Sequence, residues 1–335
     1  MKKEIGVGVI GLGMGKNMLA VNHDADSRLE VRALCDTSAT LLEQMQSEHH
    51  IPFATTDYQQ LLARPDISVV GIYSPDHLHK EHIAAAAAAG KHIICTKPMV
   101  VSLAEAQQTV QIVRQAGIKF LVGQTCRFVP EFMAAKQLYD DGDLGRPLFA
   151  EAHYVHDIRS VLDRTPWRHQ HPQDFLYGGA CHPIDLLRWF FGDVEEVFVY
   201  ASRSEFDPRY TRHDNFLINL RFHSGVIARV LAVFGLVEPP MPSLGLGIYG
   251  DKGSVVNDQV VLDKLVGQPV LKLNFKREQG HGREVWRYMR HFEECLVENK
   301  RPLIDEVEGA QVIATAAACW ESIHTGLPAK VIRVS

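Results

Sequence analysis

Residues 5–16, IGVGVIGLGMGK, together with residues 30–36, EVRALCD, decide the fold of the first part of the chain. Residues 5–10 and 30–35 have the composition of strands buried on both faces, and a helical pattern follows each of them, from residue 15 and over 38–49. The same alternation predicts strands at 68–73, 92–95 and 119–123 and helices at 80–89 and 103–116. Short buried strands that alternate with helices indicate a doubly wound parallel α/β sheet.

The pattern changes after residue 130. A helix at 131–139 precedes long β-type runs, and two amphipathic helices and a further strand follow them; the runs lie at 148–155, 194–201, 216–222, 226–234 and 270–275, the helices at 283–298 and 307–324, and the strand at 330–334. A chain of 335 residues exceeds the size at which one core stops growing. We therefore predict two domains, 1–125 and 126–335. The second is an α+β domain with a large, mainly antiparallel open sheet.

Composition excludes several classes of protein. Hydrophobic residues make up 46% and charged residues 22%, which is typical of an ordinary globular protein. The net charge of -5, without a dense Lys and Arg cluster, argues against nucleic acid and membrane partners. No stretch approaches the roughly eighteen apolar residues that a membrane helix needs. We expect a soluble, cytoplasmic protein whose six scattered cysteines are reduced core residues.

The glycines of the opening stretch predict a dinucleotide site. Gly11, Gly13 and Gly15 follow the first strand and open the helix, where backbone N–H groups and the helix dipole face a pyrophosphate. A literal GxGxxG match that begins at Gly6 has its first two glycines inside the strand. It is therefore excluded as the phosphate-binding turn. In the chosen register Lys16 takes the third glycine position, and the neighbouring Gly15 can restore close packing. A glycine turn without a ligand is the alternative.

Asp36 stands at the end of the second strand, where the dinucleotide fingerprint of a Rossmann domain needs an acidic residue for the adenosine ribose. Its carboxylate can accept hydrogen bonds from both ribose hydroxyls and would repel a 2′-phosphate. NAD is therefore the preferred cofactor, and NADP remains possible because Thr37 and Ser38 could contact a phosphate. A capping role for the next helix is the alternative for Asp36.

Two further residues have the chemistry that a carbinol dehydrogenase needs. Lys97 follows the strand at 92–95, at the carboxyl edge of the sheet, and its ammonium can stabilise developing alkoxide charge. His182 precedes Pro183 at the start of a predicted helix, and an ordinary imidazole pKa of about 6.5 suits proton transfer. A surface lysine and a structural histidine are the alternatives.

These motifs occur in an order that resembles the glucose-fructose oxidoreductase, inositol dehydrogenase and rhizopine catabolism family, written Gfo/Idh/MocA. The resemblance runs over nearly the whole chain and rests on the turn at Gly11, on Asp36, on SPDHLH at 74–79, AGKHIICTKP at 89–98 and RFVP at 127–130, and on the helix of His182. It implies that Lys97 is the active-site lysine and His182 the acid/base histidine. The implied cofactor residues are Gly11, Gly13, Met14, Gly15, Asp36, Thr37, Ser74, Pro75, His79, Lys97 and Gln124.

The chain departs from the family pattern at two positions. Thr96 replaces the usual Glu before the lysine, and Gly178 stands where members often carry an aspartate four residues before the histidine. Asp174, Asp185 or Tyr177 could supply the missing acid, although Asp185 is equally explained by the helix dipole. Further side chains expected to line the substrate cleft, with loop packing as the alternative, are Arg127, Trp167 and Arg168.

The histidines at 77, 79 and 82, and those at 169 and 171, have a spacing that resembles metal ligands. The resemblance places the first group at a helix start on the cofactor side, and no acidic or cysteine ligands cluster nearby. Hydride chemistry on a nicotinamide needs no metal. We therefore expect no metal site.

The sequence thus predicts an NAD(P)-dependent oxidoreductase, in the CH–OH dehydrogenase class, that acts on a secondary carbinol of a sugar, cyclitol or sugar derivative. The substrate is expected between the two domains, where Lys97 and His182 converge on the nicotinamide ring. A non-enzymatic dinucleotide-binding regulator and an NAD-dependent glycosidase or lyase are the alternatives. One face of the broad sheet is free for subunit contact, which favours a homodimer or homotetramer.

Overall fold

The computed structural model describes residues 3–165, 167–208, 210–265, 267–273 and 282–335. The chain divides into two compact units. Unit 1 contains Met1–Thr125, Glu278–Ala310 and Val334–Ser335, and unit 2 contains Cys126–Arg277 and Gln311–Arg333. The first boundary between the two units falls after Thr125.

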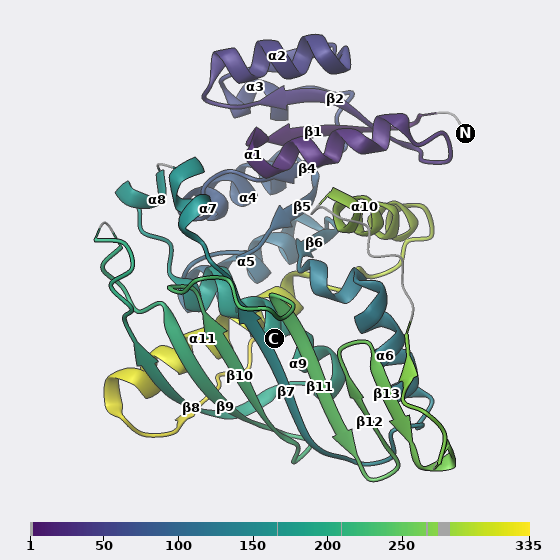
Figure 1. The fold of residues 1–335 in the computed structure, drawn as a ribbon. Helices are drawn as coiled ribbons and strands as arrows, with labels where there is room; N and C mark the ends of the chain where they lie inside the picture. The colour runs from purple at the N-terminus through teal and green to yellow at the C-terminus, as the bar shows by residue number, and fades with distance from the viewer. Residues whose placement is uncertain (1–2, 166, 209, 266, 274–281) are drawn as a thin grey trace. The chain divides into compact units, whose positions relative to one another are not determined.

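Unit 1 is built on a six-stranded parallel sheet in the order β3-β2-β1-β4-β5-β6, which confirms the predicted doubly wound fold (Figure 1). The strands are β1 (Ile5–Ile10), β2 (Leu29–Cys35), β3 (Phe53–Thr55), β4 (Val69–Ile72), β5 (His92–Thr96) and β6 (Phe120–Gly123). The connecting helices are α2 (Ala39–His49), α3 (Tyr58–Leu62), α4 (His79–Ala88) and α5 (Leu103–Ala116). Serine side chains cap the N-termini of two of these helices. The Ser38 hydroxyl accepts a hydrogen bond from the Leu41 N–H, and the Ser102 hydroxyl accepts one from the Glu105 N–H.

The first crossover differs from the predicted single helix that begins at residue 15. A short helix α1 (Leu12–Gly15) continues into a 3-10 helix η1 (Lys16–His23). The sequence analysis also missed the three-residue strand β3, which is too short to give an alternating pattern.

Helix α10 (Gly282–Val297) belongs to unit 1, although it follows the strands of unit 2 in the sequence. Its apolar face includes Val285, Tyr288, Met289 and Phe292, all buried, and it contacts η1 and β6. On the same helix, Glu293 accepts hydrogen bonds from the Ser27 hydroxyl at 2.6 Å and the Arg28 N–H at 3.0 Å. The helix is therefore attached to the parallel sheet by both apolar and polar contacts, which sequence order alone does not reveal.

Unit 2 contains a nine-stranded sheet in the order β14-β13-β12-β11-β7-β10-β9-β8-β15. Among the described strand pairs of this nine-stranded sheet, only β7 and β10 pair in parallel, so the predicted mainly antiparallel sheet is confirmed. Its strands are β7 (Pro147–Val155), β8 (Val194–Ser202), β9 (Asn215–Phe222), β10 (Ile227–Val233), β11 (Leu244–Gly250), β12 (Gly253–Val256), β13 (Gln259–Leu262), β14 (Leu271–Lys272) and β15 (Ala329–Lys330).

Three of these strands, β11, β12 and β13, were not predicted. Glycines interrupt the apolar pattern of β11, and β12 and β13 are only four residues long. The strand predicted at 270–275 is the short β14, and residues 274–281 lie outside the described residues. The strand predicted at 330–334 is shortened to β15.

The helices of unit 2 are α6 (Pro130–Asp140), α7 (Arg159–Arg164), α8 (Trp167–Gln170), α9 (Cys181–Phe191) and most of α11 (Glu306–Thr325). Helices α9 and α11 lie on one face of the nine-stranded sheet (Figure 1). Helix α9 contacts β7, β10 and β11, and nearly all of its side chains are buried. The described part of the chain holds no helix with the length and apolar composition to cross a membrane.

Candidate functional site

The predicted cofactor residues of unit 1 line one edge of the parallel sheet. Asp36 follows β2, Gly11 follows β1, Ser74 comes just after β4, Lys97 follows β5 and Gln124 follows β6. These strands are neighbours in the order β2-β1-β4-β5-β6, and all run the same way. Their carboxyl ends therefore bring the five residues to the edge where folds of this kind bind ligands.

The three glycines of the turn after β1 have different structural roles. Gly11 has a φ of 88°, and a Cβ there would lie 2.5 Å from the Tyr73 carbonyl carbon. Gly13 has no atom within 4 Å of its Cβ position, so its backbone is open to a ligand. A Cβ on Gly15 would lie 2.8 Å from the Val9 side chain, so the helix can pack closely on the strand because residue 15 is glycine. Gly15 thus has the packing role that the motif gives to its third glycine, whose position Lys16 occupies here.

Asp36 is connected to this turn. Its Oδ2 accepts the Leu12 N–H at 2.7 Å, and its Oδ1 accepts the Ser38 N–H at 2.9 Å. Ser38, not Asp36, caps α2. A carboxylate has about four acceptor positions, so two remain for ligand hydroxyls.

Two histidines of α4 hold the loop after β4. His79 places Nδ1 2.8 Å from the Pro98 carbonyl oxygen and Nε2 2.9 Å from the Ser74 carbonyl oxygen, so its ring joins the loops after β4 and β5. His82 Nδ1 lies 2.8 Å from the Ser74 hydroxyl. Burial lowers the pKa of both histidines.

Both imidazoles thus have partners within the protein. Within the described ranges, no group of three or more His, Cys, Asp or Glu side chains is arranged to hold a metal ion.

The remaining predicted cofactor residues differ in exposure. Met14 and Thr37 are exposed, Lys97 is half-buried, and the peptide bond between Lys97 and Pro98 is cis. Pro75 begins the 3-10 helix η2 (Asp76–Leu78). Gln124 is buried, and its Oε1 has no hydrogen-bond partner among the described residues.

These observations test whether a dinucleotide fits unit 1. The open backbone at Gly13 leaves space beside the turn, the Asp36 carboxylate keeps acceptor capacity, and the buried Gln124 amide oxygen lacks a partner. All three lie at one sheet edge, and they have the properties needed to contact a pyrophosphate, a ribose and a polar ring substituent. The residues present therefore fit the group.

In unit 2 the segment before His182 is a π-helix, η4 (Leu176–Ala180), that leads directly into α9. Its two glycines have close neighbours at their Cβ positions. The Cβ position of Gly179 overlaps the Phe234 ring, and a Cβ on Gly178 would lie 2.5 Å from the Gln173 side chain. Gln173 thus takes the space that a side chain at residue 178 would need. π-Bulges of this kind are frequent at functional sites.

His182 lies in the first turn of α9 and is buried. Its Nδ1 is 3.6 Å from the Cys126 sulphur, and the Tyr154 ring approaches edge-on with 5.5 Å between ring centroids. Burial raises the pKa of Tyr154, so its phenol stays neutral.

Arg127 and Asp185 form a buried, two-pronged ion pair. Arg127 Nε donates to Asp185 Oδ2 at 2.9 Å, and Nη2 donates to Oδ1 at 2.7 Å. The side chains are only 3% and 0% exposed. The pair therefore links the 3-10 helix η3 (Thr125–Phe128) to α9.

Asp174 also has structural partners. One carboxylate oxygen accepts the Leu176 N–H at 2.9 Å and the other accepts the Trp320 Nε1–H at 2.7 Å. Burial raises the pKa of Asp174 against these hydrogen bonds. Asp174 thus anchors the start of the π-helix, and Tyr177 is buried within it.

The described contacts place two predicted substrate residues beside each other. The Arg168 guanidinium lies 4.3 Å from the centre of the Trp167 ring, and its Nε donates to the Gln173 amide oxygen at 3.2 Å. Both side chains are half-buried. The guanidinium therefore lies over the aromatic face, as in a cation–π contact.

Two family matches agree with this geometry. Residues 5–124 match the oxidoreductase family, NAD-binding Rossmann fold, and residues 136–331 match its C-terminal alpha/beta domain. The chain belongs to the Gfo/Idh/MocA oxidoreductase family. It is therefore an NAD(P)-dependent oxidoreductase with an NAD-binding Rossmann domain.

Named relatives of this Gfo/Idh/MocA protein span most of its length. It is 26% identical to the uncharacterized oxidoreductase YrbE of Bacillus subtilis, over 99% of this chain and 98% of YrbE. It is 27% identical to myo-inositol 2-dehydrogenase of Thermotoga maritima, over 76% and 75% of the two chains. Levoglucosan dehydrogenase in complex with NADH and levoglucosan has the same fold, with a TM-score of 0.89 and 23% identity over 98% and 100% of the chains.

Sequence reasoning missed three residues around the candidate site of this family member. Cys126 was interpreted as a core cysteine; all six cysteines are indeed free and buried, but this one contacts His182. Gln173 and Tyr154 were not singled out. Their contacts with Gly178 and His182 depend on the tertiary fold, and no motif or spacing in the sequence signals them.

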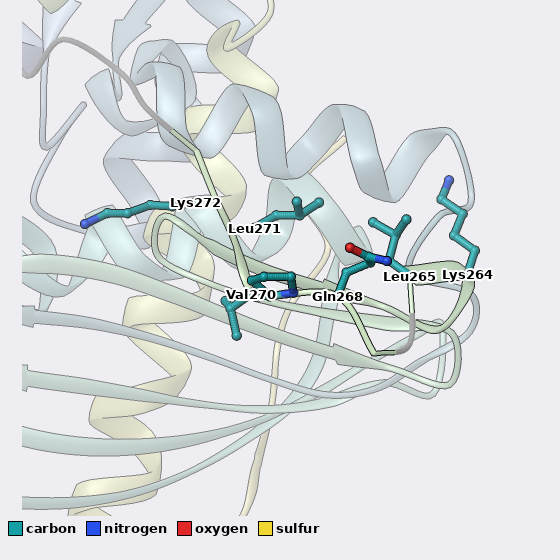
Figure 2. Close-up of a pocket in the computed structure, with 7 residues that line it drawn as sticks. Lys264, Leu265, Gln268, Val270, Leu271 and Lys272 are labelled. Atoms are coloured by element: carbon teal, nitrogen blue, oxygen red, sulfur yellow. The ribbon is translucent and has the colours of Figure 1, made fainter.

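A surface cavity of about 630 Å³ lies at the β14 end of the nine-stranded sheet (Figure 2). Its lining includes Lys264, Leu265, Val270, Leu271 and Lys272. None of the candidate site residues of this Gfo/Idh/MocA protein lines it, so we assign it no part in the reaction.

Proposed function

We propose that this protein is a dehydrogenase that transfers a hydride between NAD and a secondary carbinol of a sugar, a cyclitol or a sugar derivative. The observation that carries the proposal is the row of Gly11, Asp36, Ser74, Lys97 and Gln124 along one edge of the parallel sheet. An ammonium on the edge that binds a dinucleotide is suited to stabilise charge on the oxygen of a reacting carbinol.

Each residue has a defined task in the proposed reaction. The dinucleotide, when bound, accepts or supplies the hydride. Lys97 holds the substrate oxygen and stabilises its developing negative charge. His182 exchanges the carbinol proton, because imidazole is the side chain that most commonly takes up and releases protons in enzymes. The substrate class is supported by relatives that are named as an inositol and a levoglucosan dehydrogenase.

The test is a screen of sugars, cyclitols and sugar acids with NAD⁺ and NADP⁺, in which nicotinamide absorbance reports turnover. With the substrate that the screen identifies, Lys97→Met and His182→Ala should each lower turnover about a hundredfold or more while sparing dinucleotide binding. The matched control is His223→Asn, because His223 is exposed in the turn between β9 and β10. Full activity in either site variant contradicts the role of that residue.

We propose NAD as the preferred cofactor because of Asp36. Its carboxylate sits at the end of β2 with two acceptor positions left, and its charge would repel a 2′-phosphate. Asp36→Asn keeps an acceptor for the Leu12 N–H but removes the charge. We expect at least a tenfold fall in the ratio of NAD to NADP efficiency, since a charge-assisted hydrogen bond is worth about 1.5 to 3 kcal/mol. An unchanged ratio contradicts the assignment.

We also propose that the open face of the nine-stranded sheet forms a homo-oligomer. Tyr200 on β8 pairs with Leu217 on β9, which pairs with Leu231 on β10, and all three side chains are at least 38% exposed. They form a continuous apolar row on one sheet face, which favours contact with a second copy. Leu217→Lys should convert the oligomer into a monomer in sedimentation experiments. An unchanged oligomer after this substitution contradicts the proposed interface.

A regulator that binds a dinucleotide without catalysis is the second candidate. It is favoured by Gly178, since Gln173 takes the adjacent space and no carboxylate reaches His182 from that position. Such a protein would bind NAD and give no turnover across the screen. An NAD-dependent glycosidase or lyase, in contrast, would retain NAD through purification and convert substrate without net reduction of added cofactor.

A further inference from the structure

The imidazole ring of His79 contacts two backbone carbonyls at the carboxyl edge of the parallel sheet. His79 is the first residue of α4 and is 1% exposed. Its Nδ1 lies 2.8 Å from the Pro98 carbonyl oxygen, and its Nε2 lies 2.9 Å from the Ser74 carbonyl oxygen. Both distances are those of hydrogen bonds. One buried ring therefore reaches the loop after β4 and the loop after β5, which carries Lys97.

The two contacts together need two protons on the ring. A carbonyl oxygen only accepts hydrogen bonds, so each ring nitrogen of His79 must donate one. A neutral imidazole has a single N–H, and its other nitrogen would direct a lone pair at the lone pairs of an oxygen. The imidazolium has two N–H groups and satisfies both carbonyls. The number of loops that His79 holds therefore depends on its protonation.

The segment around Lys97 is anchored on both sides of the His79 contact. Before it, Thr96 pairs with Gly123 of β6, where an added Cβ would lie 3.4 Å from the Thr96 Cα. After it, Met99 and Val100 are at most 1% exposed. The hydrogen bond from His79 to the Pro98 carbonyl falls between these two anchors, directly beside Lys97. It therefore limits how far the backbone of the lysine can move.

The charge of the His79 ring is set by opposing influences. Burial lowers its pKa, while the two carbonyls and the charge of Asp76 raise it. An imidazolium at residue 79 also disfavours one at His82. Because burial is the largest influence, the imidazolium forms below the ordinary histidine pKa of about 6.5.

Helix α4 packs against η2, α3, α5, β4 and β5. The titratable and charged side chains of these elements, of the residues that follow β4 and β5, and of α4 itself are Asp76, His77, Tyr58, Glu105, Arg114, His92, Cys95, Tyr73, Lys97, Lys80, Glu81 and His82. Among them, Asp76 of η2 is the carboxylate that favours the charged ring of His79, and it is itself buried.

We propose that His79 is a positioning residue for Lys97, and that the uptake of one proton joins the loops after β4 and β5 through its ring. As the imidazolium, the ring donates to both carbonyls and ties the two loops together. As the neutral form, it donates to one carbonyl and releases the other. The step is a proton exchange with water, and no other bond to the ring forms or breaks. The inference rests on the proposed function for the task of Lys97 alone.

The two ring nitrogens act on different parts of the candidate site. Nδ1 holds the loop of Lys97, whose ammonium has to meet the substrate oxygen, and a displacement of about 1 Å can lower a rate about a hundredfold. Nε2 holds Ser74, whose backbone lies against the glycine turn: a Cβ on Gly11 would lie 2.6 Å from the Ser74 nitrogen. His79 thus connects the lysine loop to the loop beside the dinucleotide turn.

The first experiment is a pH titration followed by nuclear magnetic resonance, and it needs no substrate. Histidine labelled with nitrogen-15 is incorporated into the full-length protein, and the His79 resonances are assigned by their loss in His79→Asn. Serine and proline carry carbon-13 at their carbonyls, so that Ser74 and Pro98 report on the two hydrogen bonds. In mild acid both ring nitrogens should be protonated. As the pH rises, one should lose its proton, and the carbonyl resonance of its partner should move with the same midpoint.

The second experiment separates the two nitrogens with a matched pair of variants that cannot titrate. Asn places its amide nitrogen close to the position of Nδ1, and Gln close to that of Nε2. His79→Asn should keep the bond to Pro98 and a nearly unchanged kcat. His79→Gln should keep the bond to Ser74 but lower kcat about tenfold or more, while the Kd for NAD changes less than about twofold. The control is His50→Asn, because His50 is exposed in unit 1 and its φ of 53° suits Asn.

The outcomes separate this proposal from the dehydrogenase function. A His79 ring that stays neutral at every pH at which the protein is folded overturns the proton-dependent bridge, as do carbonyl resonances that do not follow its titration. Equal kcat values in His79→Asn and His79→Gln overturn the positioning of Lys97. If the screen finds no turnover, a carbonyl resonance that follows the titration still supports the bridge, and the dehydrogenase is contradicted instead. If neither variant folds, the titration of the wild type decides.

Discussion

The glycine turn of unit 1 and the surroundings of His182 in unit 2 are built in different ways, one mainly from backbone and the other from side chains. At the turn, Gly11 is required by its φ, Gly13 leaves the backbone open, and Gly15 permits close packing. Around His182, side chains from distant segments meet: Cys126 contacts the imidazole ring, and Arg127 forms an ion pair with Asp185. Backbone sites leave a mark in the sequence because only glycine meets their demands, whereas side-chain sites depend on tertiary contacts.

The largest expected effect separates two glycines of the same turn. Gly11→Ala forces a Cβ against the Tyr73 carbonyl carbon at a φ of 88°, so both the fold and the affinity for NAD should suffer. Gly13→Ala meets no protein atom within 4 Å. Its Cβ should instead obstruct the pyrophosphate, with an affinity loss of about a hundredfold and an unchanged melting temperature. Calorimetric titration and thermal unfolding measure the two quantities.

Equal losses of stability in the two variants would contradict the assignment of separate roles. Undiminished NAD affinity in Gly13→Ala would mean that the dinucleotide does not approach this backbone. Either result would mean that the backbone of this turn does not form the dinucleotide site in the way proposed.

The next effect tests the side-chain half of the comparison. The Asp185 side chain is 0% exposed, and Arg127→Met removes its ion-pair partner. Because a charge is then left buried and unpaired, the free energy of unfolding should fall by about 3 to 5 kcal/mol. Replacing both residues, Arg127→Met with Asp185→Leu, should recover much of that loss, since no charge is then left buried. Denaturant unfolding measures both variants. A loss as large in the double variant as in the single one would show that the ion pair is not the source of the stability.

The fold of unit 1 was largely predictable because its evidence is periodic and local. Buried strands, helix caps and the turn at Gly11 all lie within short segments, so the alternation of elements could be extrapolated to a parallel sheet. The contacts of α10 with unit 1 were not predictable in this way. The Ser27 hydroxyl donates a hydrogen bond to Glu293 of this helix, and the two residues are 266 positions apart in the sequence. No local sequence pattern carries that information.

The candidate site was predictable only in part. Lys97 and Asp36 follow strands of a recognisable sheet, so their common edge could be inferred before the structure was known. The neighbours of His182 could not, because Cys126 looks like any buried cysteine in the sequence. The histidines at 79 and 82 lie between these two cases. Their spacing resembles that of metal ligands, although no metal site was expected, and in the structure both contact Ser74 in the loop after β4.

The smallest expected effect concerns that loop, where side chains support the backbone site. His82 is buried against Ser74 and Tyr58, and burial lowers its pKa below the unfolded value of about 6.5. As pH falls below about 6.5 the unfolded chain binds a proton that folded His82 resists, so stability should decrease toward acid. The slope for one such proton is at most about 1.4 kcal/mol per pH unit.

The variant that isolates this contribution is His82→Gln, which cannot titrate. It should be less stable than wild type by about 1 kcal/mol at neutral pH because the hydrogen bond to the Ser74 hydroxyl is weakened. Its melting temperature should also fall less steeply between neutral and mildly acidic pH. Substitution of the exposed His223 by Asn should leave that slope unchanged. If the acidic slope is the same in His82→Gln and wild type, His82 is not the group that couples the Ser74 loop to pH.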